Sequence, residues 1–373
     1  MNLPLFMTPK LIAELHFFRF PLTEVDQWLR IVLDIFIETK FFSIFSILFG
    51  VGFYIFIERA KEKGLNHYTL YIRRLLFLAL IGFLHIVFLW YGDILLTYAV
   101  GGFLLLLFSR LGKKSLQVII SILTLLLVLL LSIPFFSSPE HILKEMETIN
   151  SNQEIVQTAI YTYQEADYLE LVEFRIENEL IPIMQNLPFS ALPALYMFLL
   201  GFYIAKKNIF TSFKQNKKLI KKAWLISLCI SLMLSAFIIL LHVDAFNFGM
   251  TVNHVYLQNV ITLSGLSGSI FYMSTFMIIL KNKKFYRMFS PFKYVGRMAL
   301  TNYICQTILA LFIIQSFQIY GDIHLRLGMI ISIFIFIAQV VVSFYWLRLF
   351  RYGPLEWIWR NVTYGKFQPM KKN

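Results

Sequence analysis

The sequence predicts an all-α, polytopic membrane protein that forms a single integral membrane domain over residues 1–373, and three observations support this prediction. Hydrophobic residues make up 58% of the chain and charged residues only 15%, whereas about a quarter of the residues of a soluble domain are charged. Apolar segments of membrane-spanning length, about 17–25 residues, recur along the chain. Clusters of lysine and arginine separate these segments on alternate loops.

The first expected element is an amphipathic helix over residues 24–40, EVDQWLRIVLDIFIETK. Its apolar side chains recur at helical spacing, at positions 25, 28, 29, 32, 35 and 36. This spacing places one apolar stripe along the helix. We expect the helix to lie on the outer membrane interface. No signal peptide is predicted before it, because the opening MNLPLFMTPK lacks a basic region followed by a long apolar stretch.

Nine apolar segments follow, and each is predicted to be a transmembrane helix because of its length and hydrophobicity. The third segment is short, and the fourth ends at Pro134, which suits a helix exit. The predicted spans are 41–57, 75–91, 94–109, 116–135, 189–205, 223–241, 257–280, 298–317 and 327–347. In the seventh span, Ser264, Gly265 and Gly268 are small residues that favour close helix packing.

The basic residues predict which side each loop faces. They lie between spans one and two, three and four, five and six, and seven and eight, and in the tail 348–373. Basic loops remain in the cytoplasm, so the C-terminus is predicted to be cytoplasmic and residue 1 outside. The long loop over 136–188 is acidic and is placed outside. The net charge of +13 is divided among several loops, which favours a membrane-lipid partner and argues against nucleic acid.

The second predicted span contains His85, an ionisable side chain in an apolar segment. It lies eleven residues after Arg74, about 16 Å along a helix and nearer the outer face. A charged or titratable group at that depth is unfavourable unless it has a partner or a cavity, so it marks a candidate functional site. A histidine there can move a proton or carry an acyl group. The alternative is a neutral histidine hydrogen-bonded to a neighbouring helix.

Asp93 follows Gly92 and precedes the third span. One interpretation is a helix cap, in which the carboxylate accepts hydrogen bonds from backbone N–H groups. The other is that Asp93 orients or charges His85 across the hairpin that joins the second and third spans. The two roles are compatible, because a cap holds its side chain in a fixed position.

Four further residues are candidates for binding substrate. Asn302 and Gln306 lie four residues apart in the eighth span and so share one helix face, with Thr301 adjacent. They either join helices or line a polar route for a ligand from the cytoplasm. Arg175 is a single base among the outer acids, and it either pairs with a nearby glutamate or binds an anionic acceptor. In the tail, Glu356 and Arg360 are placed to pair within one helix.

Other chemistries find no support in the sequence. Cys229 and Cys305 both lie in apolar segments, which suggests neither a disulfide framework nor a metal site. The chain contains no phosphate-binding glycine loop, no HExxH and no serine elbow. ATP-driven transport and metalloprotease activity are therefore not expected.

Five segments resemble a known family over nearly the whole chain. They are KFFSIFSILFG, HIVFLWYGDILLTYAVGG, MFLLGFYIAKKNIF, GRMALTNYICQ and GPLEWIWRNVTYGKFQP, and together they are similar to the YeiB-like family, also called domain of unknown function 418. The family is bacterial, lies in the inner (plasma) membrane, and is grouped with the transmembrane acyltransferases.

The resemblance implies transfer of an acyl group from cytoplasmic acyl-CoA, such as acetyl-CoA, to an extracytoplasmic glycan or lipid-linked sugar. His85 matches the intramembrane histidine of those enzymes, and Asp93 would hold its tautomer. The pantetheine arm would pass Asn302 and Gln306. The cytoplasmic bases that would bind the phosphates of CoA include Arg73, Arg74 and Arg297.

The chain departs from the family pattern at its beginning. Family members usually start with an additional helix that carries an Asp-x-x-Arg-Gly motif, whereas NLPLF here matches the stretch that normally follows. With that helix the protein would have ten spans and both termini inside. Two other functions remain open: a transporter in which His85 and Asp93 relay protons, and a non-catalytic membrane scaffold. The sequence makes no prediction of the oligomeric state.

Overall fold

The structure is a computed structural model that describes residues 6–372 except 17, 19, 149–152, 211 and 322–323. Within these residues the secondary structure is helical apart from one isolated antiparallel bridge between Phe350 and Lys371. This confirms the predicted all-α, polytopic fold.

Eight helical stretches in the described part of the chain are long and apolar enough to cross a membrane. Each overlaps most of one predicted span. The helices are α4 (Lys40–Glu62), α5 (His67–Phe88), α7 (Lys113–Ser132), α11 (Ile181–Lys206), α12 (Phe213–His242), α13 (Met250–Ile279), α16 (Ala299–Ser316) and α17 (Leu325–Leu349). The protein is therefore a multi-pass membrane protein.

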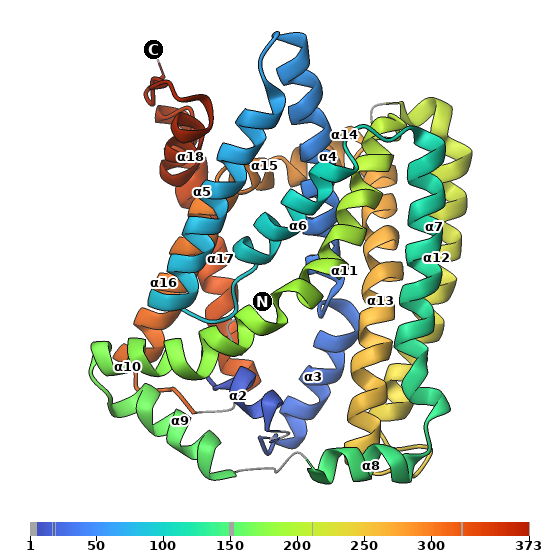
Figure 1. The fold of residues 1–373 in the computed structure, drawn as a ribbon, viewed down its shortest axis with the longest axis vertical. Coiled ribbons are helices and arrows are strands. Elements are labelled where there is room, and N and C mark those ends of the chain that lie inside the picture. The colour runs from blue at the N-terminus through green and yellow to red at the C-terminus, as the bar shows by residue number, and fades with distance from the viewer. Residues whose placement is uncertain are drawn as a thin grey trace.

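The remaining predicted span, 94–109, corresponds to α6 (Leu95–Leu107), a helix of only 13 residues. At 1.5 Å per residue it is about 20 Å long, shorter than the hydrocarbon core of about 30 Å. The turn at Gly92 and Asp93 delays the start of the helix. As a result α6 does not reach membrane-spanning length, although it runs back along α5 from the turn (Figure 1).

The short helices gather at two opposite ends of the molecule (Figure 1). One end, here called the basic end, carries α14 (Lys283–Phe289), α15 (Phe292–Arg297) and α18 (Pro354–Tyr364) beside the loop that joins α4 to α5. The other, the acidic end, carries α2 (Lys10–Leu15), α8 (Pro139–Thr148), α9 (Gln153–Glu165) and α10 (Tyr168–Arg175). The loops that share a charge sign therefore share an end of the fold, as the alternation predicts.

Most of the acidic segment 136–188 is helical. A short 3₁₀ helix (Ile133–Phe136) follows α7 and leads into α8. A π-helical turn (Ile176–Leu180) joins α10 to α11, so helix continues from Tyr168 to Lys206. A π turn inside an α-helix often occurs at a functional position.

Helix α3 (Glu24–Phe36) occupies the predicted amphipathic segment and begins at Thr23, whose hydroxyl accepts a hydrogen bond from the Asp26 N–H. Four apolar side chains of its predicted stripe are exposed, whereas Asp26 and Asp34 on the opposite face are buried together with Ile31 and Leu33. The exposed apolar residues are Val25, Trp28, Val32 and Phe36. A helix with its apolar face outward and its acids inward suits a lipid environment. Its position on the outer interface stays a prediction.

Helices α4 and α11 cross with their backbones in contact, and glycine makes this approach geometrically allowed. A Cβ atom on Gly50 would lie 2.0 Å from the carbonyl oxygen of Phe198, and one on Gly201 would lie 1.9 Å from that of Ile47. Small residues at helix crossings are the usual means of close packing in membranes. Around the crossing, side chains of α4, α5, α6 and α11 form the main apolar core.

Candidate functional site

His85 lies in the last turn of α5 and is only 1% exposed. Its carbonyl oxygen accepts hydrogen bonds from the N–H groups of Leu89 and Trp90, which end the helix. On the ring, Nε2 lies 3.0 Å from Oγ1 of Thr307 on α16. The buried imidazole is therefore held between α5 and a helix more than 200 residues further along the chain.

Asp93 contacts both α6 and His85. Its Oδ2 accepts a hydrogen bond of 2.7 Å from the Leu96 N–H, which caps the start of α6. Its Oδ1 lies 3.5 Å from Nδ1 of His85 and accepts a hydrogen bond of 3.3 Å from the Tyr303 hydroxyl. The Asp93 carboxylate thus has both of the roles that the sequence suggested: it caps α6 and it lies next to His85.

Gly82 brings this carboxylate close to α5. A Cβ atom at Gly82, one turn before His85, would lie 2.5 Å from the Leu96 nitrogen and 2.8 Å from Oδ2 of Asp93. Only glycine leaves room for the 93–96 turn against the helix. Gly82, Tyr303 and Thr307 were not among the residues that the sequence pointed to, although Tyr303 and Thr307 lie beside the candidate residues of span eight.

The arrangement is suited to general acid–base chemistry. The imidazole has a hydroxyl at one nitrogen and a carboxylate at the other, and a carboxylate in that position fixes the tautomer and stabilises a transient imidazolium. With the proton on Nδ1, facing Asp93, the lone pair of Nε2 is directed toward Thr307. No cluster of three or more metal-ligating His, Cys, Asp or Glu side chains occurs among residues 6–372 that are described.

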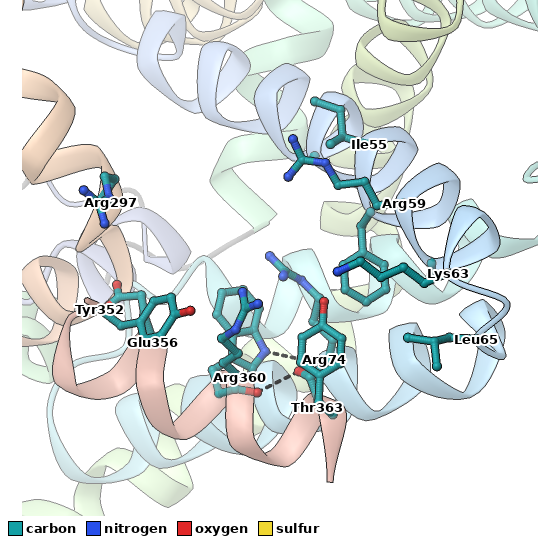
Figure 2. A pocket seen from close by; sticks show the side chains of 15 residues that line it. Ile55, Arg59, Lys63, Leu65, Arg74, Arg297, Tyr352, Glu356, Arg360 and Thr363 are labelled. Atoms are coloured by element: carbon teal, nitrogen blue, oxygen red, sulfur yellow. Dashed lines mark hydrogen bonds between the residues drawn. The ribbon is translucent and has the colours of Figure 1, made fainter. Parts of the chain in front are cut away.

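A basic cavity of about 400 Å³ opens at the basic end between α4, α5 and α18. Five cationic side chains line it: Arg59, Lys63, Arg74, Arg297 and Arg360. Figure 2 shows Arg59 and Lys63 projecting from α4, and Arg360 from α18, toward Arg74. Helix α18 is fixed to α5 there, because Nε1 of Trp359 donates a hydrogen bond of 2.9 Å to the Arg74 carbonyl.

Two of the three bases predicted to bind the coenzyme, Arg74 and Arg297, line this cavity, and the third does not. Arg73 is exposed on another face of α5, because neighbouring residues point about 100° apart around a helix. Arg59, Lys63 and Arg360 were missed as a group because they come from segments 300 residues apart. His85 lies about 16 Å along α5 from Arg74 and does not line the cavity.

The polar residues of span eight join helices. Asn302 donates a hydrogen bond of 2.9 Å to the Ser343 hydroxyl on α17, and its carbonyl accepts one of 2.7 Å from Gln339. The hydroxyl of Thr301 donates to Glu356 at 2.5 Å. Gln306 is half-buried on the same helix, and neither it nor Asn302 lines the basic cavity. These contacts favour the helix-joining interpretation over a ligand route.

Glu356 also caps α16, which the sequence did not predict. Its Oε1 accepts hydrogen bonds from the N–H groups of Leu300 and Thr301 at 2.7 and 3.0 Å. The expected pair partner, Arg360, lies instead over the rings of Tyr352 and Tyr364. Helix α18 therefore holds the start of the helix that carries Tyr303 and Thr307.

Comparison with known proteins agrees with the resemblance found in the sequence. The model of a family described as "Protein of unknown function (DUF418)" matches residues 204–366. The Uncharacterized protein YxaH of Bacillus subtilis (strain 168) is 32% identical over 374 residues, which cover 97% of this chain and 88% of that protein. The chain belongs to the DUF418 family.

Two other relatives in this family align over most of their length. The Uncharacterized 39.9 kDa protein in amylase 3'region of Bacillus acidopullulyticus is 29% identical, covering 94% of this chain and 87% of that protein. The Uncharacterized protein YeiB of Escherichia coli (strain K12) is 26% identical, covering 92% and 86%. No solved structure matches the chain. The DUF418 match contains α16, α17 and α18, while the alignments with relatives cover nearly the whole chain.

Arg175 lies at the acidic end beside the helix end that carries His85. It is 3% exposed and donates hydrogen bonds of 3.3 Å to the Phe88 carbonyl and to the Tyr163 hydroxyl. The same hydroxyl donates to Oε1 of the buried Glu179 at 2.7 Å. Arg175 therefore supports the C-terminal end of α5, where the carbonyl groups carry negative partial charge.

A second buried polar cluster was missed entirely. Lys40, 2% exposed, donates hydrogen bonds to the Asp34 carbonyl at 2.5 Å and to the Ser264 hydroxyl at 2.6 Å. The carboxylate of Asp34 lies 2.8 Å from Arg30 and 3.0 Å from Nε2 of His242. In the sequence Lys40 looks like a flanking charge at the start of a span, so its burial could not be anticipated.

The small residues of α13 make space for this cluster, in agreement with the predicted close packing. A Cβ atom on Gly265 would lie 2.2 Å from the Thr39 hydroxyl, and one on Gly268 would lie 2.9 Å from the side chain of Lys40. The junction between α3 and α4 is thus fixed against α13. Thr39 itself has a left-handed backbone (φ 60°), and its hydroxyl donates to the Ile261 carbonyl at 2.8 Å.

Proposed function

We propose that the protein is a membrane acyltransferase that moves an acyl group from acyl-CoA, such as acetyl-CoA, to the hydroxyl of a glycan or lipid-linked sugar on the opposite face. One observation supports it most. Helix α5 carries Arg74 in the basic cavity and His85 beside Asp93, so a single helix joins an anion-attracting surface to an acid–base pair. The resemblance to transmembrane acyltransferases also supports this proposed function.

The proposed location is the bacterial plasma membrane, with the basic end and the C-terminus in the cytoplasm. Basic loops are retained on the cytoplasmic side of a membrane, and here they gather at one end of the fold (Figure 1). Acyl-CoA is made in the cytoplasm, so its phosphates would meet Arg74 and Arg297 first. The acceptor would approach from the acidic end, toward the end of α5 that Arg175 supports.

In the proposed reaction His85 is the general base. The acceptor hydroxyl gives its proton to Nε2 of His85 while its oxygen bonds to the thioester carbonyl carbon. The carbon–sulfur bond then breaks, and the CoA thiolate takes the proton from the imidazolium. Asp93 stabilises that imidazolium through Nδ1, and Tyr303 holds Asp93 in place.

This route requires movement, because His85 is enclosed by α5, α6 and α16. The Thr307 hydroxyl is hydrogen-bonded to Nε2 of His85, the nitrogen that would receive the proton. The substrates therefore reach His85 only when α16 and α5 separate and the Thr307 contact opens. Such gating steps are common in enzymes that keep water out of the site.

The test is CoA release from acetyl-CoA by purified protein in mild detergent, followed with a thiol reagent. His85→Ala is compared with His67→Ala, which removes a histidine from the opposite end of the same helix. We expect His67→Ala to retain release and His85→Ala to lose it by about 100-fold or more, the usual contribution of a general base. Equal release by the two variants would refute the role of His85.

A further inference from the structure

We infer that the basic cavity binds a ligand that carries at least two phosphate groups, through Arg59, Lys63 and Arg360 together with Arg74. The inference deepens the proposed function and rests on it for the direction from which the donor approaches. It adds Arg59, Lys63 and Arg360 to the bases that were predicted to bind the coenzyme. It also identifies the phosphate groups as the part of the ligand that these residues bind.

The cavity carries an excess of positive charge. The cavity has five cationic side chains and one carboxylate, Glu356. Both oxygens of that carboxylate are used at the start of α16, by Leu300 and Thr301. In the part of the chain that the structure describes, no carboxylate forms a salt bridge with any of the five cations. Unpaired positive charges that share a partly enclosed space attract an anion.

Aromatic rings hold two of the arginines in place. The guanidinium of Arg74 lies 3.9 Å from the ring centre of Trp359, and that of Arg360 lies 5.0 Å from the rings of both Tyr352 and Tyr364. Stacking fixes the plane of a guanidinium and leaves its N–H groups available. Within the described chain, Nε of Arg360 is buried and has no hydrogen-bond partner.

The size of the cavity and the placement of its cations suit a ligand with two phosphate groups. A volume of about 400 Å³ lies in the range of small-molecule sites, and it exceeds what one inorganic phosphate needs. Arg59 and Lys63 come from one turn of α4, whereas Arg360 comes from α18 on the facing side (Figure 2). Cations on two walls match phosphate groups joined in series. Arginine binds each phosphate through two parallel hydrogen bonds.

Two sources carry such phosphates: a soluble coenzyme or nucleotide, and the headgroup of an anionic lipid. The experiment measures binding of CoA and of inorganic pyrophosphate to the detergent-purified protein by calorimetry. A parallel arm compares thermal stability in nanodiscs with and without cardiolipin, an anionic lipid whose headgroup carries two phosphates. The variants are Arg59→Gln and Arg360→Gln, and the matched control is Arg287→Gln, an exposed arginine of α14 at the same end of the fold that does not line the cavity.

We expect CoA and pyrophosphate to bind, each cavity variant to weaken binding at least tenfold, and Arg287→Gln to change it by less than twofold. Stabilisation by cardiolipin alone, lost in the cavity variants, would support a phosphate site occupied by lipid and would contradict the proposed donor. Cavity variants that bind every probe like the wild type, or a wild-type protein that binds none, would overturn the inference. CoA binding without CoA release would keep the phosphate site and refute the proposed function.

Discussion

The contact between α4 and α11 gives the sharpest prediction about the fold. Replacing Gly50 with alanine adds a Cβ atom 2.0 Å from the Phe198 carbonyl oxygen, and 2.7 and 2.8 Å from the Phe198 carbonyl carbon and Cα. All three obstacles are backbone atoms of α11, so no side-chain rotation relieves the overlap. Ordinary carbon–oxygen contacts between helices begin at about 3.3 Å, so the two helices must separate locally by about 1.3 Å.

The magnitude follows from this displacement. Overpacking a close-packed interior destabilises proteins by about 1–3 kcal/mol, and more where the structure resists movement. The two helices cannot easily separate here, because Gly201 of α11 makes the reciprocal close contact with Ile47 of α4 in the same crossing. We therefore expect Gly50→Ala to lower the free energy of unfolding by about 3 kcal/mol.

Gly52 is the matched control, since it lies on the same helix and a Cβ atom there would have no neighbour within 4 Å. Gly52→Ala should be neutral or stabilise the protein by up to about 1 kcal/mol through helix propensity. Unfolding is followed by tryptophan fluorescence during titration from mild detergent into SDS. If Gly50→Ala unfolds at the same SDS fraction as Gly52→Ala, the reasoning about backbone contact is refuted.

Three further predictions concern the polar contacts. Thr307→Val leaves a ring nitrogen of His85 buried without a partner and should destabilise the protein by about 1–3 kcal/mol, whereas Thr307→Ser should retain most of the stability in the same SDS titration. Glu356→Ala removes the cap of α16 and should lower stability by about 1–2 kcal/mol, with Glu356→Gln intermediate; equal stability of the two variants would contradict capping by the carboxylate. Lys40→Met removes two hydrogen bonds and should lower stability by about 1–3 kcal/mol, and an unchanged titration would show that the buried lysine contributes nothing.

Much of the fold follows from the sequence because lipid imposes simple rules. Spans must be long, apolar and helical, and every predicted span overlaps a helix of the structure. The length of α6 could not be read from hydropathy, since apolar residues continue up to Asp93 and beyond it. The orientation of α3 could be read only in part. Periodicity identifies an apolar stripe, but it does not reveal that the opposite face buries Asp26 and Asp34.

The candidate site was predictable where it is local. His85 and Asp93 are eight residues apart and joined by a short turn, so their proximity follows from the hairpin. Thr307 meets His85 across 222 residues, and such a contact depends on which helices become neighbours. The contact of Glu356 with α16 could not be predicted for the same reason. A carboxylate four residues before Arg360 suggests a pair within one helix, but the unsatisfied N–H groups of α16 bind it instead.

The contacts of α18 suggest how the two candidate sites are connected. Trp359 fixes α18 to α5 at Arg74, and Glu356 fixes it to the start of α16. The same two helices meet again at His85 and Thr307. A ligand that moves α18 in the basic cavity therefore acts on both helices that enclose His85.

The most direct test of the acyl-transfer proposal uses sealed proteoliposomes with acetyl-CoA on the face that carries the basic loops. CoA release is measured with and without a proton gradient, for the wild type and for His85→Ala. The account predicts release that depends on His85 and proceeds equally well without a gradient. Release that survives in His85→Ala, or acetyl-CoA that stays intact while a solute crosses the membrane only when a gradient is imposed, would contradict it.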